Sequence, residues 1–345
     1  MVHLRIVAPA DVAERALELL RASESVYEVV HLPGTAIKPL GDLILADVAR
    51  EDASVVVEDL RELDIPTTGS ITIEPIETQL SVGARHAERH AMGLPGDAVV
   101  WEDVDSRTEE LTELSATFVS FMVLAMLIAT LGLILDQPIL IVGAMVVGPE
   151  FGPLAGVCVG LVQRQHGLLR QSLAALAVGF PVGIAATFVF ALLLDAAGEI
   201  PGGFQPADHP LTSFVSRPDA LSFVVAFIAG IAGMLSLTSA KSGALIGVLI
   251  SVTTIPAAAN VGVASAVGEW GEAGGALGQL ALNLTAIVVA GVLTLFVQRR
   301  HYMRRRVRHL SDPTRAEAGL PVGHSRHSRR SRANGGRGSR SRSES

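Results

Sequence analysis

The spacing of hydrophobic positions divides the first part of the chain into short strands and helices. Over residues 1 to 78, apolar residues alternate in runs such as HLRIVAP and recur every three or four residues in runs such as DVAERALELLRAS. Alternation is typical of strands, and the second spacing is typical of amphipathic helices. The resulting βαββαβ order predicts a small α+β domain of the ferredoxin-like, split βαβ type. This architecture by itself implies no ligand.

The pattern changes after a polar connector. Residues 79 to 113 form this connector, and we expect its stretch Thr108 to Leu114 to run directly into a membrane helix. Between residues 114 and 298 the chain has six apolar segments, each near the roughly 20 residues that cross a bilayer. They predict a polytopic α-helical membrane domain with spans at 115–135, 138–162, 172–194, 220–239, 243–266 and 276–297.

Basic residues are distributed unevenly between the predicted loops. Starting from a cytoplasmic N-terminus, the inside loops hold Arg164, Arg170 and Lys241, and the outside loops hold only Arg217. Basic residues favour the cytoplasmic side, so this bias predicts an even number of spans and two cytoplasmic termini. The N-terminus lacks the basic and apolar regions of a secretory signal. Scarce Lys and abundant Arg, Ala and Gly suggest a bacterium, so we expect a multi-pass protein of the bacterial inner membrane.

Composition agrees with a membrane location. Apolar residues make up 49% of the 345 residues and the mean hydropathy is +0.45, which is too apolar for a water-soluble chain of this length. Residues 299–345 contain fourteen arginines against three acidic residues and few apolar ones, and we expect a basic disordered tail there. Its arginines favour contact with anionic lipid headgroups. We do not expect nucleic acid as a partner.

The membrane region resembles itself after a shift of 104 residues. This shift aligns the first three apolar segments with the last three without a gap, and it superimposes their turns and breaks. Repeats of three spans must insert with opposite orientations, so the pattern predicts two inverted three-helix repeats of the kind found in secondary transporters. Chance similarity between two small-residue hairpins is the alternative.

The most informative stretch is ILIVGAMVVGPEFGPLAG, which contains a carboxylate inside an apolar segment. Pro149, Gly152 and Pro153 predict a helix break, and Glu150 lies within it. An intramembrane carboxylate costs roughly 2.5 to 3.5 kcal/mol or more, so it is treated as a functional residue unless another explanation exists. Glu150 could bind a cation or carry a proton. Alternatively, the segment forms two re-entrant halves and Glu150 lies near an interface.

The corresponding stretch of the second half carries uncharged polar groups. Thr253, Thr254 and Asn260 surround the predicted helix break at Pro256 and could line the same cavity as Glu150. Such residues also serve as hydrogen-bonding contacts between membrane helices. Asp136 and Lys241 occupy matching charged turns, either as substrate contacts or as topology anchors. Ridges of glycines favour close helix packing and are compatible with a homo-oligomer.

Sequence signals of an enzyme are missing. His86 and His90 have the spacing of a zinc pair, but HAERH lacks the glutamate position of the HExxH motif. There is no P-loop, GxSxG elbow or cysteine cluster, and Cys158 is the single cysteine. We therefore expect no enzymatic activity, no metal and no cofactor.

At LGLILDQPILIVGAMVVGPEFGPLAG the chain resembles the bacterial and archaeal family named domain of unknown function 389. The resemblance rests on the IVGAM segment with its Pro-containing break and on the later SGALIGVLIS and PAAAN stretches. Many members have a variant of Ala-Pro where this chain has Gly148, Pro149 and Glu150. The resemblance implies a membrane protein of this architecture and supplies no substrate, catalytic residue or cofactor.

These observations lead to one principal hypothesis and two alternatives. The principal hypothesis is a transporter or channel-like protein for an ion or small solute, with its site at the two helix breaks. The first alternative is a membrane-anchored sensor or scaffold whose cytoplasmic domain binds a ligand. The second is an intramembrane enzyme acting on lipid, for which the sequence offers few polar groups.

Overall fold

The sheet-containing end of the chain and its apolar helices form separate units. The computed structural model describes residues 1–76, 78–91, 98–200, 219–239, 253–311 and 313–324. The N-terminal unit comprises Met1–Asp103 together with Gln298–Ser345, and the membrane unit comprises Val104–Val297. Helix α13, Trp270–Leu310, contributes residues to both units. Each unit is described by itself below.

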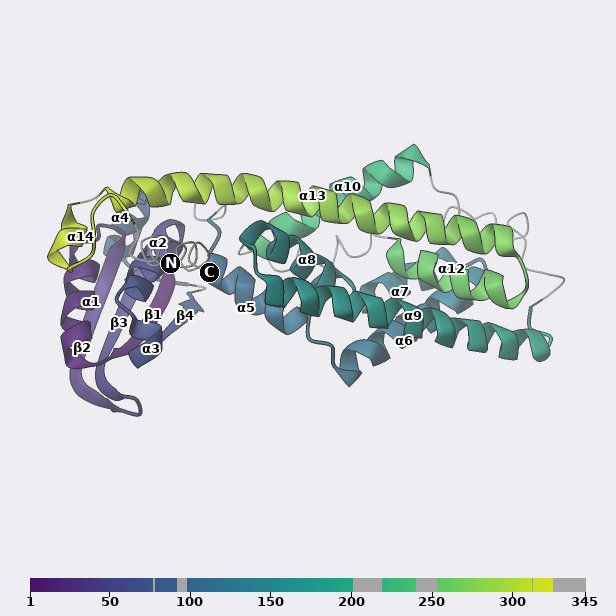
Figure 1. Ribbon diagram of the computed structural model, residues 1–345, viewed down its shortest axis with the longest axis horizontal. Helices are drawn as coiled ribbons and strands as arrows, with labels where there is room; N and C mark the ends of the chain where they lie inside the picture. The colour runs from purple at the N-terminus through teal and green to yellow at the C-terminus, as the bar shows by residue number, and fades with distance from the viewer. Residues whose placement is uncertain (77, 92–97, 201–218, 240–252, 312, 325–345) are drawn as a thin grey trace, which may run out of the picture. The chain divides into compact units, whose positions relative to one another are not determined.

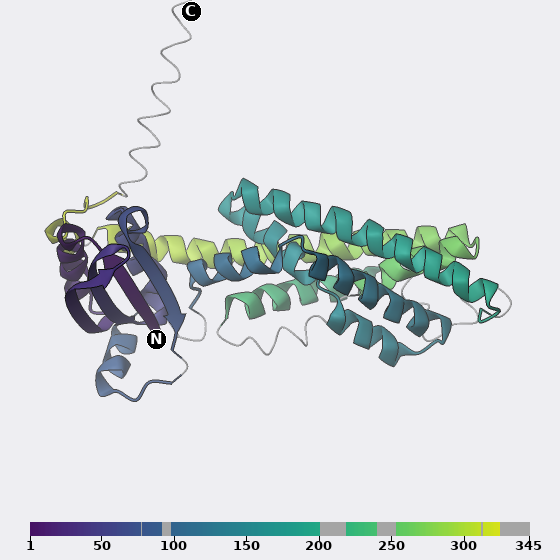
Figure 2. The same ribbon diagram turned by 90° about the horizontal axis from the view of Figure 1, so that it is seen from below.

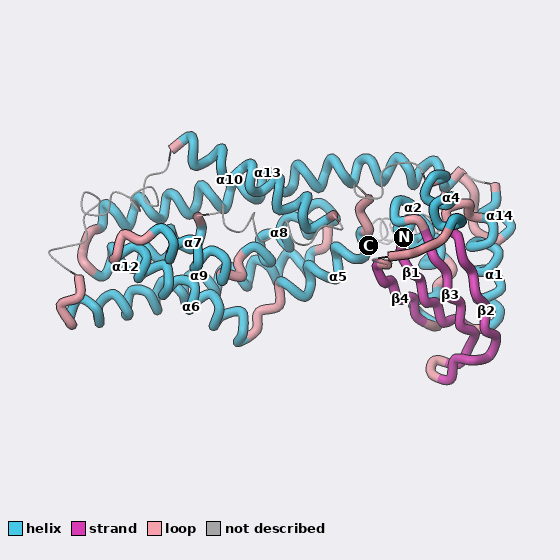
Figure 3. The backbone as a smooth tube through the Cα atoms, turned by 180° about the vertical axis from the view of Figure 1, so that it is seen from behind, coloured by secondary structure: helices cyan, strands magenta, loops and turns pink. Residues whose placement is uncertain are grey.

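The N-terminal unit is built on a four-stranded antiparallel sheet with the order β2-β3-β1-β4 (Figure 3). In β1 the side chains of Val2, Leu4 and Ile6 are buried. They lie on the same face of the sheet, because successive side chains of a strand point to opposite faces. The strands and the helices between them are β1 Val2–Ala8, α1 Ala10–Ala22, β2 Val26–Ile37, β3 Leu40–Val48, α2 Arg50–Glu62, α3 Ile65–Thr68 and β4 Ser70–Pro75.

The element order of this sheet is the expected βαββαβ, with the short helix α3 added before β4. Leu4 pairs with Ala46 of β3 and with Ile73 of β4, which places β1 in the centre. Apolar side chains of α1 and α2 pack on the sheet and complete its core. A further helix, α4 Val82–His90, begins at Ser81, whose hydroxyl accepts hydrogen bonds from two backbone amides.

The C-terminal segment belongs to this unit, which corrects the expected disordered tail over residues 299–345. Helix α13 continues to Leu310, and the short helix α14 spans Thr314–Glu317. Ala318 and Leu320 are buried in the same apolar cluster as β1 and α1. The expectation rested on the small number of apolar residues in this segment. A few buried apolar side chains are enough to order it, because buried ion pairs also hold it to the domain. Residues 325–345 of the expected tail lie outside the described residues.

The membrane unit consists of apolar helices, whose long members run side by side (Figure 1, Figure 2). Helix α5, Trp101–Leu111, does not run into the first of them, contrary to expectation, because Ser115 accepts a hydrogen bond from the Phe118 amide and begins a new helix. The helices of this unit are α6 Ala116–Ile134, α7 Pro138–Val147, α8 Phe151–Gln163, α9 His166–Ala196, α10 Ala220–Thr238, α12 Thr254–Ala266 and the first part of α13.

Four of the described helices, α6, α9, α10 and α13, are long and apolar enough to cross a membrane. Helices α7 and α8 make a fifth candidate span, which is bent by 51° at their junction. The described residues therefore contain four to five candidate spans, which is compatible with a membrane protein, and the expected number was six. The expected span 243–266 is described only in its second half, as α12, because residues 240–252 lie outside the described residues.

Helices α8 and α12 lie along α9 and run in opposite directions from their N-termini (Figure 1). The backbone of Gly160, near the end of α8, lies against Leu169 at the start of α9. Gly262, well inside α12, lies against Ile184 and Thr187 in the second half of α9. The two short helices thus begin near the middle of α9, and this arrangement brings their N-termini together.

Candidate functional site

A break between α7 and α8 places Glu150 in the interior of the membrane unit. Helix α7 ends at Val147, and Gly148 and Pro149 separate it from α8, which begins directly after Glu150. A Cβ atom at Gly148 would collide with the Glu150 carboxylate and lie 2.7 Å from Cγ1 of Ile255, so a side chain at this position would force Glu150 or Ile255 to move. Gly152 and Pro153 lie in the first turn of α8 and not in the break. A proline is tolerated there, because the first backbone amides of a helix have no hydrogen-bond partner within the helix.

The side chain of Glu150 is 3% exposed and touches the second helix break. The Thr254 hydroxyl donates a hydrogen bond of 2.7 Å to Oε1 of Glu150 across a separation of 104 residues. The other carboxylate oxygen, Oε2, is buried and has no hydrogen-bond partner among the described residues. A carboxylate in such surroundings must be protonated or neutralised by a cation, because an unpaired buried charge is very costly.

Two helix N-termini converge on this carboxylate. Glu150 precedes the first residue of α8, and Thr254 is the first residue of α12. Pro256 lies in the first turn of α12, and the segment before Thr253 lies outside the described residues. The unpaired amides of a helix N-terminus carry partial positive charge, so both helices help to hold a negative charge at this point.

Helix α13 adds two amide side chains that the sequence analysis missed. Asn283 donates a hydrogen bond of 2.8 Å to the Thr253 hydroxyl, and Gln279 donates one of 3.2 Å to Oδ1 of Asn283. Both amide side chains are 1% exposed. Their four-residue spacing inside an apolar segment is a sequence signal, because it puts two polar groups on one helix face. The averaged hydropathy of the segment conceals that signal.

The remaining predicted residues lie apart from Glu150. Asn260 is two turns further along α12 and donates a hydrogen bond of 3.1 Å to Glu272 of α13. Asp136 lies in the turn between α6 and α7, where its backbone has a positive φ of 49°. Lys241 lies outside the described residues. The structure therefore joins Glu150 directly to Thr254, connects Thr253 to α13, and leaves Asn260 and Asp136 elsewhere.

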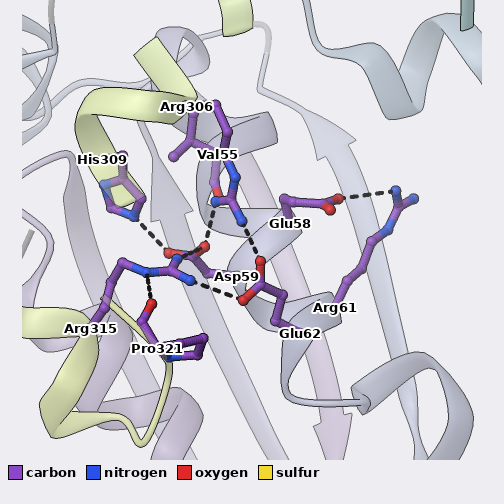
Figure 4. A network of polar contacts seen from close by, with 9 residues as sticks. All are labelled: Val55, Glu58, Asp59, Arg61, Glu62, Arg306, His309, Arg315 and Pro321. Atoms are coloured by element: carbon purple, nitrogen blue, oxygen red, sulfur yellow. Dashed lines mark hydrogen bonds and ion pairs between the residues drawn. The ribbon is translucent and has the colours of Figure 1, made fainter. Parts of the chain in front are cut away.

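A second polar cluster, in the N-terminal unit, holds the C-terminal segment (Figure 4). Asp59 and Glu62 of α2 are fully buried and face the side chains of Arg306 and Arg315. Glu62 accepts one hydrogen bond of 2.8 Å from Arg306 and one of 2.9 Å from Arg315. Asp59 pairs with both arginines and also with Nε2 of His309 at 2.6 Å. We call these five residues the carboxylate–arginine cluster.

The surroundings of Asp59 decide its ionisation. Burial by itself would raise the pKa of Asp59, but the hydrogen bond from His309 and the charges of Arg306 and His309 hold it below its ordinary value. Nearby, burial raises the pKa of Asp52, and the charge of Arg305 only partly opposes this effect. Asp59 is therefore a charged structural residue, whereas Asp52 has little to compensate its burial.

A cavity of about 430 Å³ lies beside the cluster, within the N-terminal unit. Its walls come from α1, α2, α4 and the C-terminal segment. Its lining includes both acidic and basic side chains, among them Asp52, Asp59, Arg305, His309 and Arg315. This size lies within the range of small-molecule sites.

Among the described residues, no three His, Cys, Asp or Glu side chains are grouped as metal ligands. The rings of His86 and His90 stack with their centroids 6.1 Å apart. Cys158 is buried, and its sulfur lies 3.7 Å from the Val288 carbonyl oxygen of α13.

Comparison with known proteins finds a family model and a relative that are similar to part of the chain. Residues 145–289 match the family model described as "Domain of unknown function (DUF389)". The chain is also 25% identical over 200 residues to "Uncharacterized protein MJ0678" of Methanocaldococcus jannaschii. That match covers 56% of this chain and 59% of the relative, so the chain spans less than two thirds of the relative's length. No solved structure matches the chain.

The matched region contains every residue of the Glu150 site. It begins before the break between α7 and α8 and ends after Asn283. The resemblance expected from the IVGAM segment and the later PAAAN stretch is therefore confirmed. Residues 145–289 of the chain are thus similar to the domain of unknown function 389 family.

Proposed function

We propose that this protein is a transporter or channel-like protein that moves a cation or small solute past Glu150. The observation that supports the proposal most is the buried hydrogen bond between Glu150 and Thr254 at the meeting point of two half-helices. Half-helices that begin near the membrane centre are typical of substrate sites in secondary transporters. The proposal assigns no enzymatic chemistry to the chain.

An inverted repeat would explain why these two residues meet. Glu150 and Thr254 are separated by 104 residues, the same shift that aligns the two halves of the sequence. Residues related by a two-fold axis can touch each other only where they lie close to that axis. Helices α8 and α12, which run in opposite directions, also fit such an axis. Within this proposal the chain has six spans, with residues 243–252 supplying part of the fifth.

The decisive test is flux through the purified full-length protein in liposomes. Proton flux is followed with a pH-sensitive dye and cation flux with a potential-sensitive dye, for wild type and for Glu150→Gln. The matched control is Glu199→Gln, which removes an exposed carboxylate at the end of α9. We expect flux in wild type and in the control and its loss in Glu150→Gln. Equal flux in all three proteins would exclude Glu150 as the transport site.

The cavity of the N-terminal unit favours a second candidate function, that of a membrane-anchored sensor. Asp52 and Arg305 present opposite charges to the cavity, which suits a small ligand carrying both an anionic and a cationic group. The test is the melting temperature of the full-length protein with each of the common L-amino acids, for wild type and for Asp52→Asn. A rise that the variant loses would support sensing, and no rise with any of them would argue against this ligand class.

A further inference from the structure

The interface between α12 and α13 contains a row of polar side chains that ends at Glu150. Starting from the turn between these helices, the row begins with the hydrogen bond between Glu272 and Asn260. A second set of hydrogen bonds, further along α13, runs from Gln279 through Asn283 to the hydroxyl of Thr253. The next residue, Thr254, donates to Glu150. Glu272 is half-buried, so this end of the row reaches the surface of the unit.

The row has the length of half a membrane. Glu272 and Asn283 are eleven residues apart on α13, and a helix rises 1.5 Å per residue, which gives about 16 Å. The hydrocarbon core of a bilayer is about 30 Å thick. A row of this length is therefore long enough to reach from one membrane surface to the middle of a bilayer.

The unpaired atoms of this row are all oxygen acceptors. Oδ1 of Asn260, Oε1 of Gln279 and Oε2 of Glu150 are buried and have no hydrogen-bond donor among the described residues. Each of these side chains is at most 3% exposed. Buried acceptors without donors are costly, and they become satisfied when a cation binds to them. Carboxylate and amide oxygens are the ligands that hard metal cations prefer.

The first half of the membrane unit has no such row. A shift of 104 residues relates Asn260, Gln279 and Asn283 to Gly156, Ala175 and Gly179, which have no polar side chain. Gly156 lies against Thr112 and Ser172, whose hydroxyls already donate to backbone carbonyl oxygens, and Gly179 lies against the apolar side chains of Phe118 and Met122. The polar route therefore approaches Glu150 from one direction only among the described residues.

We propose that the α12–α13 interface is a one-sided entry path for a monovalent metal cation, in which the side-chain oxygens of Asn260 and Gln279 pass the partly dehydrated ion to Glu150. This inference rests on the proposed transport function and adds its substrate class and its route. A single carboxylate at the end of the path matches a single positive charge. Amide oxygens can ligate an ion but do not accept and release protons readily, so the path suits a metal cation better than a proton.

Equilibrium binding tests the path separately from transport. Radioactive sodium binding is measured on the purified full-length protein in detergent, with lithium and potassium as competitors, for wild type, Gln279→Leu and Gln279→Glu. We expect Gln279→Leu to weaken binding about tenfold or more, as loss of a ligand-shell group usually does, and Gln279→Glu to retain or strengthen it. The control is Thr285→Val, which removes an exposed hydroxyl from the same helix and should leave binding unchanged.

The outcomes separate the path from the transport function. In one outcome Glu150→Gln loses flux, whereas Gln279→Leu keeps both its sodium binding and its flux. This result would overturn the path and leave the transport proposal standing. Flux of protons alone, with no competition by any alkali cation, would overturn the substrate class. The retained binding of Gln279→Glu guards against a fold defect, because both substitutions remove the same amide.

Chemical labelling tests the direction of entry. In a Cys158→Ala background, single cysteines are introduced by Gln279→Cys and by its counterpart Ala175→Cys, and each is exposed to a cationic methanethiosulfonate reagent. We expect the reagent to modify the first variant from one side of sealed vesicles and to leave the second unmodified. Equal modification of both cysteines would contradict a one-sided path.

Discussion

Glu150 and Asp59 are both buried carboxylates, but their surroundings give them different roles. Asp59 is surrounded by Arg306, Arg315 and His309, so its charge is fully compensated in the folded chain. Glu150 has one neutral hydrogen-bond donor, Thr254, and one oxygen without a partner among the described residues. A carboxylate that already has cationic partners holds structure together, whereas one without them has an open place for a ligand.

Removing the charge of Asp59 should destabilise the N-terminal unit. Asp59→Ala leaves two buried arginines without their shared partner, and breaking a buried ion pair typically costs about 3 to 5 kcal/mol. Urea unfolding, followed by the fluorescence of buried Trp101 in a Trp270→Phe background, measures the loss. The control is Glu58→Gln, because Glu58 forms only a partly exposed pair of 3.8 Å with Arg61, which contributes about 1 kcal/mol at most. Equal stability of the two variants would contradict the assigned role of Asp59.

The same residue predicts a pH dependence. The hydrogen bond from His309 and the nearby charges lower the pKa of folded Asp59 from its ordinary value of 3.8, although burial opposes them. The unfolded chain therefore takes up this proton first as the pH falls, and the stabilisation present above about pH 4 is lost below it. The unfolding free energy of wild type minus that of Asp59→Asn should be constant near neutral pH and shrink below about pH 4. A difference that stays constant to pH 3 would show that folding does not lower the pKa of Asp59.

For transport, the hydroxyl group of Thr254 should matter more than the size of its side chain. Thr254→Val keeps the shape of the side chain and removes the donor to Glu150. A hydrogen bond to a charged group is worth about 1.5 to 3 kcal/mol, so we expect flux in liposomes to fall about tenfold or more. Thr254→Ser, which keeps the hydroxyl, should retain most of the flux. Loss of flux in both variants would indicate a packing role instead.

At the scale of helices and strands, local signals are predictable and distant partnerships are not. The alternation in HLRIVAP predicts β1, and the Gly-Pro pair predicts the end of α7, because each depends on neighbouring residues. The hydrogen bond from Asn283 to Thr253 and the burial of Arg315 against Asp59 depend on residues brought together by the whole fold. Averaged hydropathy also concealed Gln279 and Asn283, since two amides barely alter the mean of an apolar segment.

Helix packing in the membrane unit predicts which glycines tolerate a side chain. At Gly230 of α10, a Cβ atom would lie 2.9 Å from Cβ of Ala290 and 2.9 Å from the Ile287 carbonyl oxygen of α13, so the two helices would have to separate. At Gly143 of α7, a Cβ atom would meet nothing within 4 Å among the described residues. Overpacking typically costs about 1 to 3 kcal/mol.

Gly230→Ala should therefore lower the melting temperature of the protein in detergent, and Gly143→Ala should leave it unchanged or raise it slightly. The small gain expected for Gly143→Ala comes from the higher helix propensity of alanine. Equal melting temperatures for the two variants would contradict the close contact between α10 and α13.

At the scale of the whole molecule, one helix belongs to both units. Helix α13 contributes Asn283 to the polar row of the membrane unit and Arg306 to the carboxylate–arginine cluster of the N-terminal unit. This helix is continuous over 41 residues, so one element of secondary structure supplies side chains to both units. The chain folds back on its own N-terminal domain, so the end of the sequence becomes part of a domain that the first 75 residues begin.

Because the C-terminal segment packs on the N-terminal domain, two truncations of the chain should differ strongly in the stability of that domain. Ending the protein after His324 removes only residues outside the described part, and the N-terminal unit should unfold as in wild type. Ending it after Ser311 removes Arg315 and Leu320, which leaves Asp59 and Glu62 with one arginine and opens the apolar cluster at Leu320. Loss of the buried ion pairs and of a buried leucine should together cost more than about 3 kcal/mol. Trp101 fluorescence during urea unfolding compares the two proteins. If they unfold at the same urea concentration, the C-terminal segment does not hold the domain, and its arginines are free for the anionic lipids that the sequence suggested.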